Sequence, residues 1–142
     1  MLETVFSICS TLAMGGWLLL ITLPRQRLAH LVASVAIPLT IALVYLALIV
    51  QHFGTADGSF GSLADVQRLF ANPALLLAGW VHYLAFDLFI GAWEVRDAQR
   101  RGVPHLLVVP CLLLTFLFGP IGLLTYLGLR TWKAGTLDLA AA

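Results

Sequence analysis

The chain has 142 residues, of which 61% are hydrophobic and only 11% are charged. Soluble domains carry about a quarter charged residues, and a small domain cannot bury this much apolar surface, so the composition excludes a soluble globular domain and a disordered chain. The net charge of +1 provides no basic field for nucleic acid, and the expected surroundings are a lipid bilayer.

Four apolar segments are long enough to cross a bilayer, which takes about 20 residues. They cover residues 5–23, 31–50, 74–95 and 106–129, and turns rich in Pro, Gly or Arg separate them. The prediction is an all-α, multi-pass integral membrane four-helix bundle that forms a single domain over residues 1–142.

The longest loop, between the second and third segments, carries a helix signal of its own. Ser62 precedes Asp65 at the spacing of a capping box. Apolar residues follow at helical intervals, namely Leu63, Val66, Leu69 and Phe70. The loop is therefore predicted to contain a short amphipathic helix that lies in the outer interface.

The distribution of Lys and Arg predicts the orientation, because cytoplasmic loops are enriched in them. In a four-span topology the first and third loops share one side and contain Arg25, Arg27, Arg96, Arg100 and Arg101. The other side contains Arg68, Arg130 and Lys133. The first and third loops are expected in the cytoplasm, and both termini are expected outside it.

The third segment carries His82 and Asp87 near its middle, although an ionisable group at that depth costs several kcal/mol. Such groups face the bundle interior and by default mark function. At about 100° per residue, His82 lies roughly 140° from Asp87. One face collects the other notable side chains, which are Trp80, Tyr83, Asp87, Gly91 and Glu94.

This face suits a long hydrophobic substrate taken from the bilayer. Loss of water disfavours the charged form of a buried carboxyl, so Asp87 can serve as a proton donor. Tyr83, one turn away, can hydrogen-bond to Asp87 or to a ligand, while Trp80 provides an aromatic surface and Gly91 a gap. The structural alternative is that Asp87 only locks the bundle, by pairing with His82, Arg96, Ser10 or Thr115.

The fourth segment contains Gly119-Pro120 in its interior. Pro120 lacks an N–H and clashes with the carbonyl four residues earlier, so a kink is predicted near Phe116 that opens room and frees a carbonyl inside the bundle. Gly119 permits close approach of a helix or ligand. Phe116, Gly119 and Pro120 thus join Trp80 and Gly91 as candidate substrate-binding residues, although tolerated proline kinks are common in membrane helices.

Neither the two cysteines nor the four histidines have the spacing of a metal site, so no metal is expected. The pattern leaves open whether His82, Asp87 and Glu94 share one.

Five stretches carry a resemblance to a known family. They are HYLAFDLFIG at 82–91, WE at 93–94, DA at 97–98, GVPH at 102–105 and PCLLLTFLFGPIGL at 110–123. Here the chain resembles the abscisic-acid-deficient-type membrane protein family, whose plant members are associated with neoxanthin synthesis from violaxanthin. The resemblance is dense over residues 80–126, roughly a third of the chain. It implies a membrane isomerase that opens a carotenoid epoxide without net redox change or organic cofactor.

Such an isomerisation needs an acid at the epoxide oxygen and a base that removes a proton from the polyene. On physical grounds Asp87 or Tyr83 is the candidate acid, and His82 or Glu94 the candidate base. The chain begins almost directly with its first span, without a transit peptide, so a bacterial inner membrane is expected, with another carotenoid or isoprenoid as substrate. A non-catalytic carotenoid- or lipid-binding protein, a structural membrane subunit and a homo-oligomer remain open alternatives.

Overall fold

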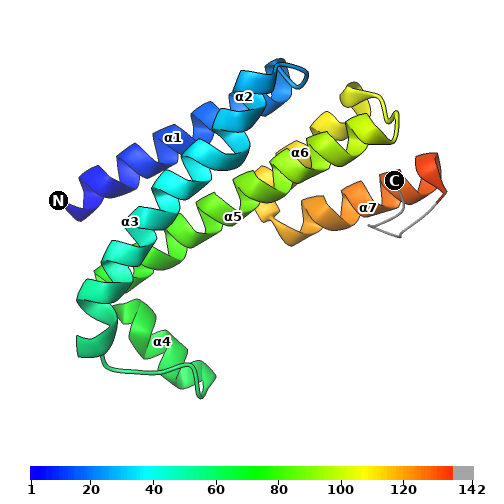
Figure 1. Ribbon diagram of the computed structural model, residues 1–142. Coiled ribbons are helices and arrows are strands. Elements are labelled where there is room, and N and C mark those ends of the chain that lie inside the picture. Colours follow the sequence, from blue (N-terminus) through cyan, green and yellow to red (C-terminus); the bar gives the residue numbers. More distant parts are fainter. Residues whose placement is uncertain (136–142) are drawn as a thin grey trace.

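The computed structural model describes residues 1–135, and all regular elements within that part of the chain are helices (Figure 1). The first is α1 (Leu2–Thr22). A continuous helical rod follows, formed by α2 (Arg27–Leu31), the π-helical turn η1 (Val32–Ala36), α3 (Ile37–His52) and the 3-10 turn η2 (Phe53–Thr55). The remaining helices are α4 (Leu63–Ala71), α5 (Pro73–Arg100), α6 (His105–Phe118) and α7 (Pro120–Ala134).

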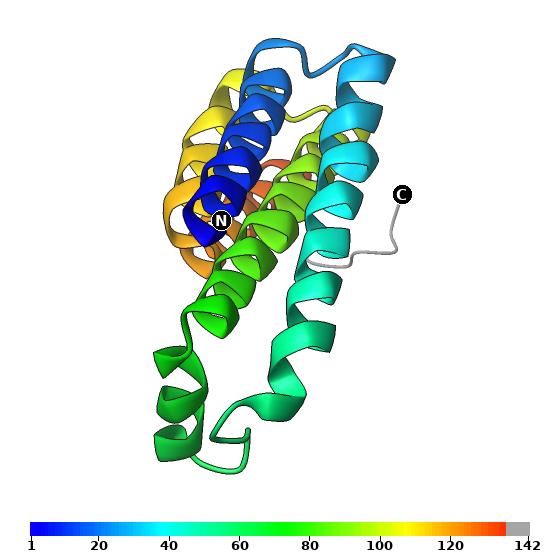
Figure 2. The ribbon, with the colours of Figure 1, turned by 90° about the vertical axis from the view of Figure 1, so that its left-hand side faces the viewer.

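Three of the described helices are long and apolar enough to cross a membrane: Leu2–Thr22, the rod Arg27–Thr55, and Pro73–Arg100. The chain is therefore a membrane protein. α5 is the central element, because it packs against α1, α3 and α6. Figure 2 shows α5 between α1 and α3. Its 28 residues correspond to a length of about 42 Å.

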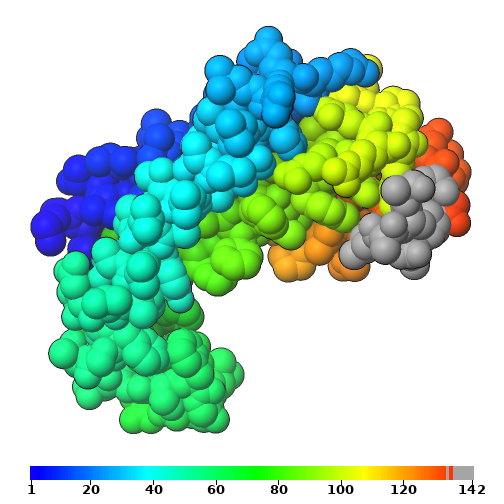
Figure 3. Space-filling view, in the orientation of Figure 1, coloured from blue at the N-terminus to red at the C-terminus, as the bar shows by residue number. Residues whose placement is uncertain are grey.

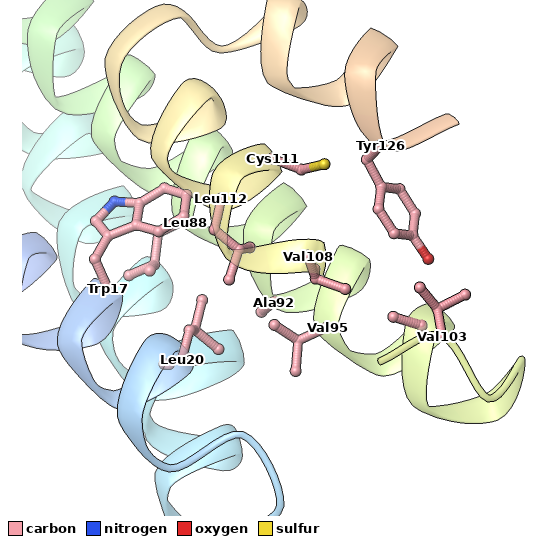
Figure 4. Packing of buried hydrophobic residues seen from close by; sticks show 12 residues of the cluster. Trp17, Leu20, Leu88, Ala92, Val95, Val103, Val108, Cys111, Leu112 and Tyr126 are labelled. Carbon is pink, nitrogen blue, oxygen red and sulfur yellow. The ribbon is translucent and has the colours of Figure 1, made fainter. Parts of the chain in front are cut away.

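The buried apolar side chains form two clusters along α5. One cluster joins α5 to α1, α6 and α7, and extends from Trp17 to Tyr126 (Figure 4). The other joins α5 to α1 and α3, and is built around Ile41 and Val81, both 0% exposed. Because α5 contributes to both clusters, the orientation of its side chains determines which of its faces can form a site.

The structure divides the predicted fourth span, residues 106–129, into two helices. The chain reverses at Gly119, and α7 packs back along α6 as a helical hairpin. Gly119 has φ +47°, a conformation that favours glycine, and Pro120 occupies the first turn of α7, where no N–H is needed. α6 has 14 residues and α7 has 15, so each is about 21–23 Å long and too short for a hydrocarbon core of about 30 Å.

The hairpin also bears on the predicted sidedness. The Nε of Arg130 lies 2.9 Å from Asp97, so α7 ends beside the end of α5. At the other end of α5, Leu2 and Phe6 line a hollow together with Pro73. The start of α1 and the end of α7 thus lie at opposite ends of α5. The prediction that both termini share a side needed a fourth span, and the side of the membrane on which each end of the chain lies stays a prediction; residues 136–142 lie outside the described part of the chain.

The basic residues are consequently more polarised than the four-span topology allowed. All Lys and Arg residues except Arg68 lie at one end of the molecule, namely Arg25, Arg27, Arg96, Arg100, Arg101, Arg130 and Lys133. The opposite end carries α4, as Figure 1 shows.

The long loop contains the helix α4, and its first turn is capped. The hydroxyl of Ser62 accepts the N–H of Asp65 at 3.1 Å and donates to its carboxylate at 2.7 Å. The hydrogen bond from Ser62, with a contribution from the charge of Arg68, holds the pKa of Asp65 below its usual value. The location of α4 in the outer interface stays a prediction.

Candidate functional site

One face of α5 meets the hairpin where α6 ends. The hydroxyl of Tyr83 donates to the carbonyl of Phe116 at 2.7 Å. The hydroxyl of Thr115 donates to Oε1 of Glu94 at 2.9 Å. Between these contacts, the carboxyl of Asp87 lies against Gly119, where an added Cβ would be 3.0 Å from Oδ1. Three side chains that the helical periodicity placed on one face therefore meet one short segment, residues 115–119.

Proline chemistry explains why a main-chain acceptor is available at this point. In a continuous helix the carbonyl of Phe116 would accept the N–H of residue 120. Pro120 has no N–H, so that carbonyl is free, and the Tyr83 hydroxyl takes the place of the missing donor. The predicted release of a carbonyl near Phe116 is confirmed, although the local geometry is a reversal rather than a kink.

Asp87 is the least satisfied group at this contact. Its side chain is half-buried, and its buried Oδ2 has no hydrogen-bond partner among the described residues. The phenol of Tyr83 lies one turn earlier on the same face of α5. Three residues that could pair with Asp87 in a purely structural role make hydrogen bonds to other residues. Arg96 donates to His30, Ser10 accepts from Trp80, and Thr115 donates to Glu94.

Glu94 is sealed beneath the hairpin. Its side chain is 0% exposed, and its Oε2 has no hydrogen-bond partner among the residues that the structure describes. α7 closes over it because Gly122 packs directly on the backbone of Thr115, where a Cβ would overlap. Glu94 thus shares the face of Asp87 but lacks access to the molecular surface.

An apolar groove runs along α5 as far as Tyr83. Its volume is about 430 Å³, and its lining is Phe70, Leu76, Gly79, Trp80, Tyr83 and Leu117. A second hollow of about 430 Å³ shares Leu76 and Trp80 with it and extends to Phe6 on α1. The ring of Trp80 lies 5.5 Å from that of Phe6 and 5.6 Å from that of Tyr83. A row of aromatic rings therefore leads along α5 to the neighbourhood of Asp87.

Two predicted site residues lie apart from this contact. His82 points to the other side of α5, where its ring stacks on Phe86 at 4.5 Å. The expected gap at Gly91 is filled, because an added Cβ would be 2.5 Å from the ring of Trp17. The structure therefore brings Tyr83, Asp87, Phe116, Gly119 and Pro120 together, with Trp80 lining the adjacent groove, but it uses Gly91 for packing between α5 and α1.

A buried polar cluster at the basic end escaped the sequence analysis. Asp97 accepts hydrogen bonds from Tyr126 at 2.6 Å and from Arg130 at 2.9 Å through Oδ2, and from Arg101 at 3.0 Å through Oδ1. Arg130 is 0% exposed. The spacing of Tyr126 and Arg130 is the available signal, since residues four apart share a helix face. The cluster attaches α7 to α5.

The three residues whose sharing of a metal was left open, His82, Asp87 and Glu94, do not come together. Within residues 1–135, no group of three or more His, Cys, Asp or Glu side chains is placed to hold a metal ion. His82 lies on a different face of α5 from Asp87 and Glu94, and the two carboxyls are two helical turns apart.

The sequence model of the ABA DEFICIENT 4-like family matches residues 4–126. This range includes the Tyr83–Asp87–Glu94 face and the turn between α6 and α7. No curated protein and no solved structure matches the chain. Because the match covers most of the chain, the protein belongs to the ABA DEFICIENT 4-like family.

Proposed function

We propose that this protein binds a carotenoid or a related polyene lipid along α5 and isomerises it by acid–base chemistry at Asp87. One observation carries the proposal: a half-buried carboxyl with an unpartnered oxygen, Oδ2, lies one turn beyond an apolar, aromatic groove. Family membership supports a membrane protein of this type. The expected setting is an inner membrane, with the basic end in the cytoplasm.

The proposed reaction opens an epoxide without loss or gain of atoms. The carboxylic acid of Asp87 donates its proton to the epoxide oxygen as the carbon–oxygen bond breaks, and the oxygen becomes a hydroxyl. A base removes a proton from the neighbouring polyene carbon, and the electron pair of that C–H bond forms a new carbon–carbon double bond. The substrate and product are therefore isomers of equal mass, because the proton removed from carbon replaces the one donated to the oxygen.

We assign the base to Asp87 itself, with Tyr83 as the group that orients it. After donating its proton, the carboxylate of Asp87 is the nearest base to the groove. Glu94 is buried under the hairpin about 10 Å further along α5, a distance given by seven residues of helix rise. His82 is on another face of α5. Neither is therefore as well placed to receive a proton from a molecule that lies in the groove.

A non-catalytic carotenoid- or lipid-binding protein is the second candidate. It is favoured by the apolar lining of the groove, in which Trp80 and Tyr83 are the residues with polar side-chain atoms. Such a protein would need the aromatic row but not the carboxyl.

The test is a pigment analysis by liquid chromatography and mass spectrometry. The protein is produced in bacteria that make a panel of carotenoids, including epoxides, beside Asp87→Asn, Tyr83→Phe and the matched control His82→Gln. The proposal expects a new isomer of unchanged mass that is lost in Asp87→Asn, reduced in Tyr83→Phe and retained in His82→Gln. Co-purification of unchanged pigment with all four proteins would instead establish the binding function. If neither product nor pigment is found, both proposals are rejected for that panel.

A further inference from the structure

A separate hollow lies at the basic end of the molecule, between the α1–α2 turn and the α5–α6 turn. Its volume is about 590 Å³. Its floor is apolar and includes Val95, Ala98 and Val103, which are 0%, 2% and 6% exposed. Its polar lining includes Arg25, Gln99 and His105. An apolar floor beside basic and hydrogen-bonding groups suits a molecule with a lipid part and an anionic part.

The two turns that form this hollow are joined by direct contacts. The side-chain amide of Gln99 donates to the carbonyl of Pro24 at 2.5 Å. Nε2 of His105 hydrogen-bonds to the carbonyl of Ile21 at 2.9 Å. Figure 3 shows the α1–α2 turn against the start of α6 at this end of the molecule. Because these bonds hold the hollow open before any ligand arrives, little ordering is needed on binding.

The charge around the hollow is strongly positive. All Lys and Arg residues except Arg68 lie at this end, and Asp97, the acidic residue that forms ion pairs there, is engaged by Arg101 and Arg130. Arg25 is exposed, and it forms no ion pair with any of the described residues. The positive charge at the rim is therefore available to an anion.

We infer that this hollow binds the headgroup of an anionic phospholipid, with Arg25 at the phosphate and the apolar floor against the glycerol and the first acyl carbons. The hollow lies where α1 ends and where the apolar part of α5 gives way to Arg96, and this is the level at which we place the headgroups. Basic pockets between membrane helices are suited to anionic headgroups. This site is independent of the groove at Tyr83.

The test is native mass spectrometry of the full-length protein, titrated with phosphatidylglycerol or with phosphatidylcholine of the same acyl chains. We expect retention of phosphatidylglycerol over phosphatidylcholine. Arg25→Gln should weaken phosphatidylglycerol binding about fivefold, the effect expected of one basic side chain near an anionic surface. The matched control is Arg27→Gln, because Arg27 is also exposed and lies two residues away but does not line the hollow. This control should bind as the unchanged protein does.

Three results would overturn the inference. Equal binding of the two lipids would remove the preference for an anionic headgroup. Equal weakening by Arg25→Gln and Arg27→Gln would replace the hollow by a diffuse attraction of the whole basic end. Displacement of phosphatidylglycerol by inorganic phosphate at low millimolar concentration would indicate a site for the free anion. Unchanged circular dichroism and thermal unfolding of both variants would show that the comparison reports binding and not misfolding.

Discussion

Replacing Asp97 with asparagine should loosen α7 from α5, because this carboxylate holds the hairpin in place. It accepts hydrogen bonds from Tyr126 and Arg130, which belong to α7, and from Arg101 at the end of α5. Arg130 is 0% exposed, so its guanidinium depends on buried contacts rather than on water. The substitution leaves the shape of residue 97 almost unchanged, removes its negative charge and replaces one accepting oxygen with an NH2 group.

The expected cost follows from the burial of the pair. Removing one member of a buried ion pair typically costs about 3–5 kcal/mol, most of which is the penalty of leaving the other charge buried. Replacing both members by neutral groups is often close to neutral. We therefore expect Asp97→Asn to lower the free energy of unfolding by about 3 kcal/mol, and the double variant Asp97→Asn/Arg130→Met to lower it by about 1 kcal/mol.

The assay is a double-mutant cycle on the protein in bicelles, with unfolding followed by circular dichroism. The single variants Asp97→Asn and Arg130→Met and the double variant are compared with the unchanged protein. Arg100→Gln is the control, because Arg100 is exposed at the same end of α5 and should change the free energy of unfolding by less than about 0.5 kcal/mol. A loss below about 1 kcal/mol in Asp97→Asn, or additive single variants, would refute the claim that this pair secures the hairpin.

Three further predictions test the packing, the topology and the loop helix. Gly91→Ala should destabilise the protein by about 1–3 kcal/mol, because the new methyl would lie 2.5 Å from the ring of Trp17. Adding Trp17→Leu should restore part of the lost stability, as measured by thermal unfolding. An unchanged melting temperature of Gly91→Ala would contradict the packing. Single cysteines in place of Arg68 and Lys133 should react with an impermeant maleimide from opposite sides of the membrane, whereas the four-span topology requires the same side. The pKa of Asp65 is lowered in the folded state. Its contribution to the stability of α4 is therefore present above the unfolded-state pKa of about 4 and is lost as pH falls through the lower folded value. Hydrogen exchange of the α4 amides should show less protection at pH 2 than at pH 5, and equal protection at the two pH values would refute this role of Asp65.

Much of the candidate site could be predicted from the sequence, because its residues are related by local geometry. Tyr83, Asp87 and Glu94 share a face of one helix, and a period of 3.6 residues is enough to group them. The free carbonyl at Phe116 follows from the missing N–H of Pro120. His82 was separated from Asp87 by the same periodicity, and the structure keeps them apart.

The contacts made by that face could not be predicted, since they depend on which helix packs against it. Gly91 looked like room for a ligand, yet Trp17 of α1 fills the space. The sequence also offered Thr115 as a partner for Asp87, but its hydroxyl bonds to Glu94. Periodicity gives the direction of a side chain on its own helix and carries no information about the neighbour that it meets.

The sequence by itself determined the membrane class, the apolar helices that precede α6 and the grouping of Tyr83, Asp87 and Glu94 on one face of α5, because hydropathy, length and helical period are properties of short segments. Only the tertiary structure decided that the chain turns back at Gly119. A kinked span and a hairpin both satisfy the local rules for a glycine followed by a proline. The choice between them rests on contacts between distant segments, above all Asp97 on α5 with Tyr126 and Arg130 on α7, and such pairing exists only once the helices have packed.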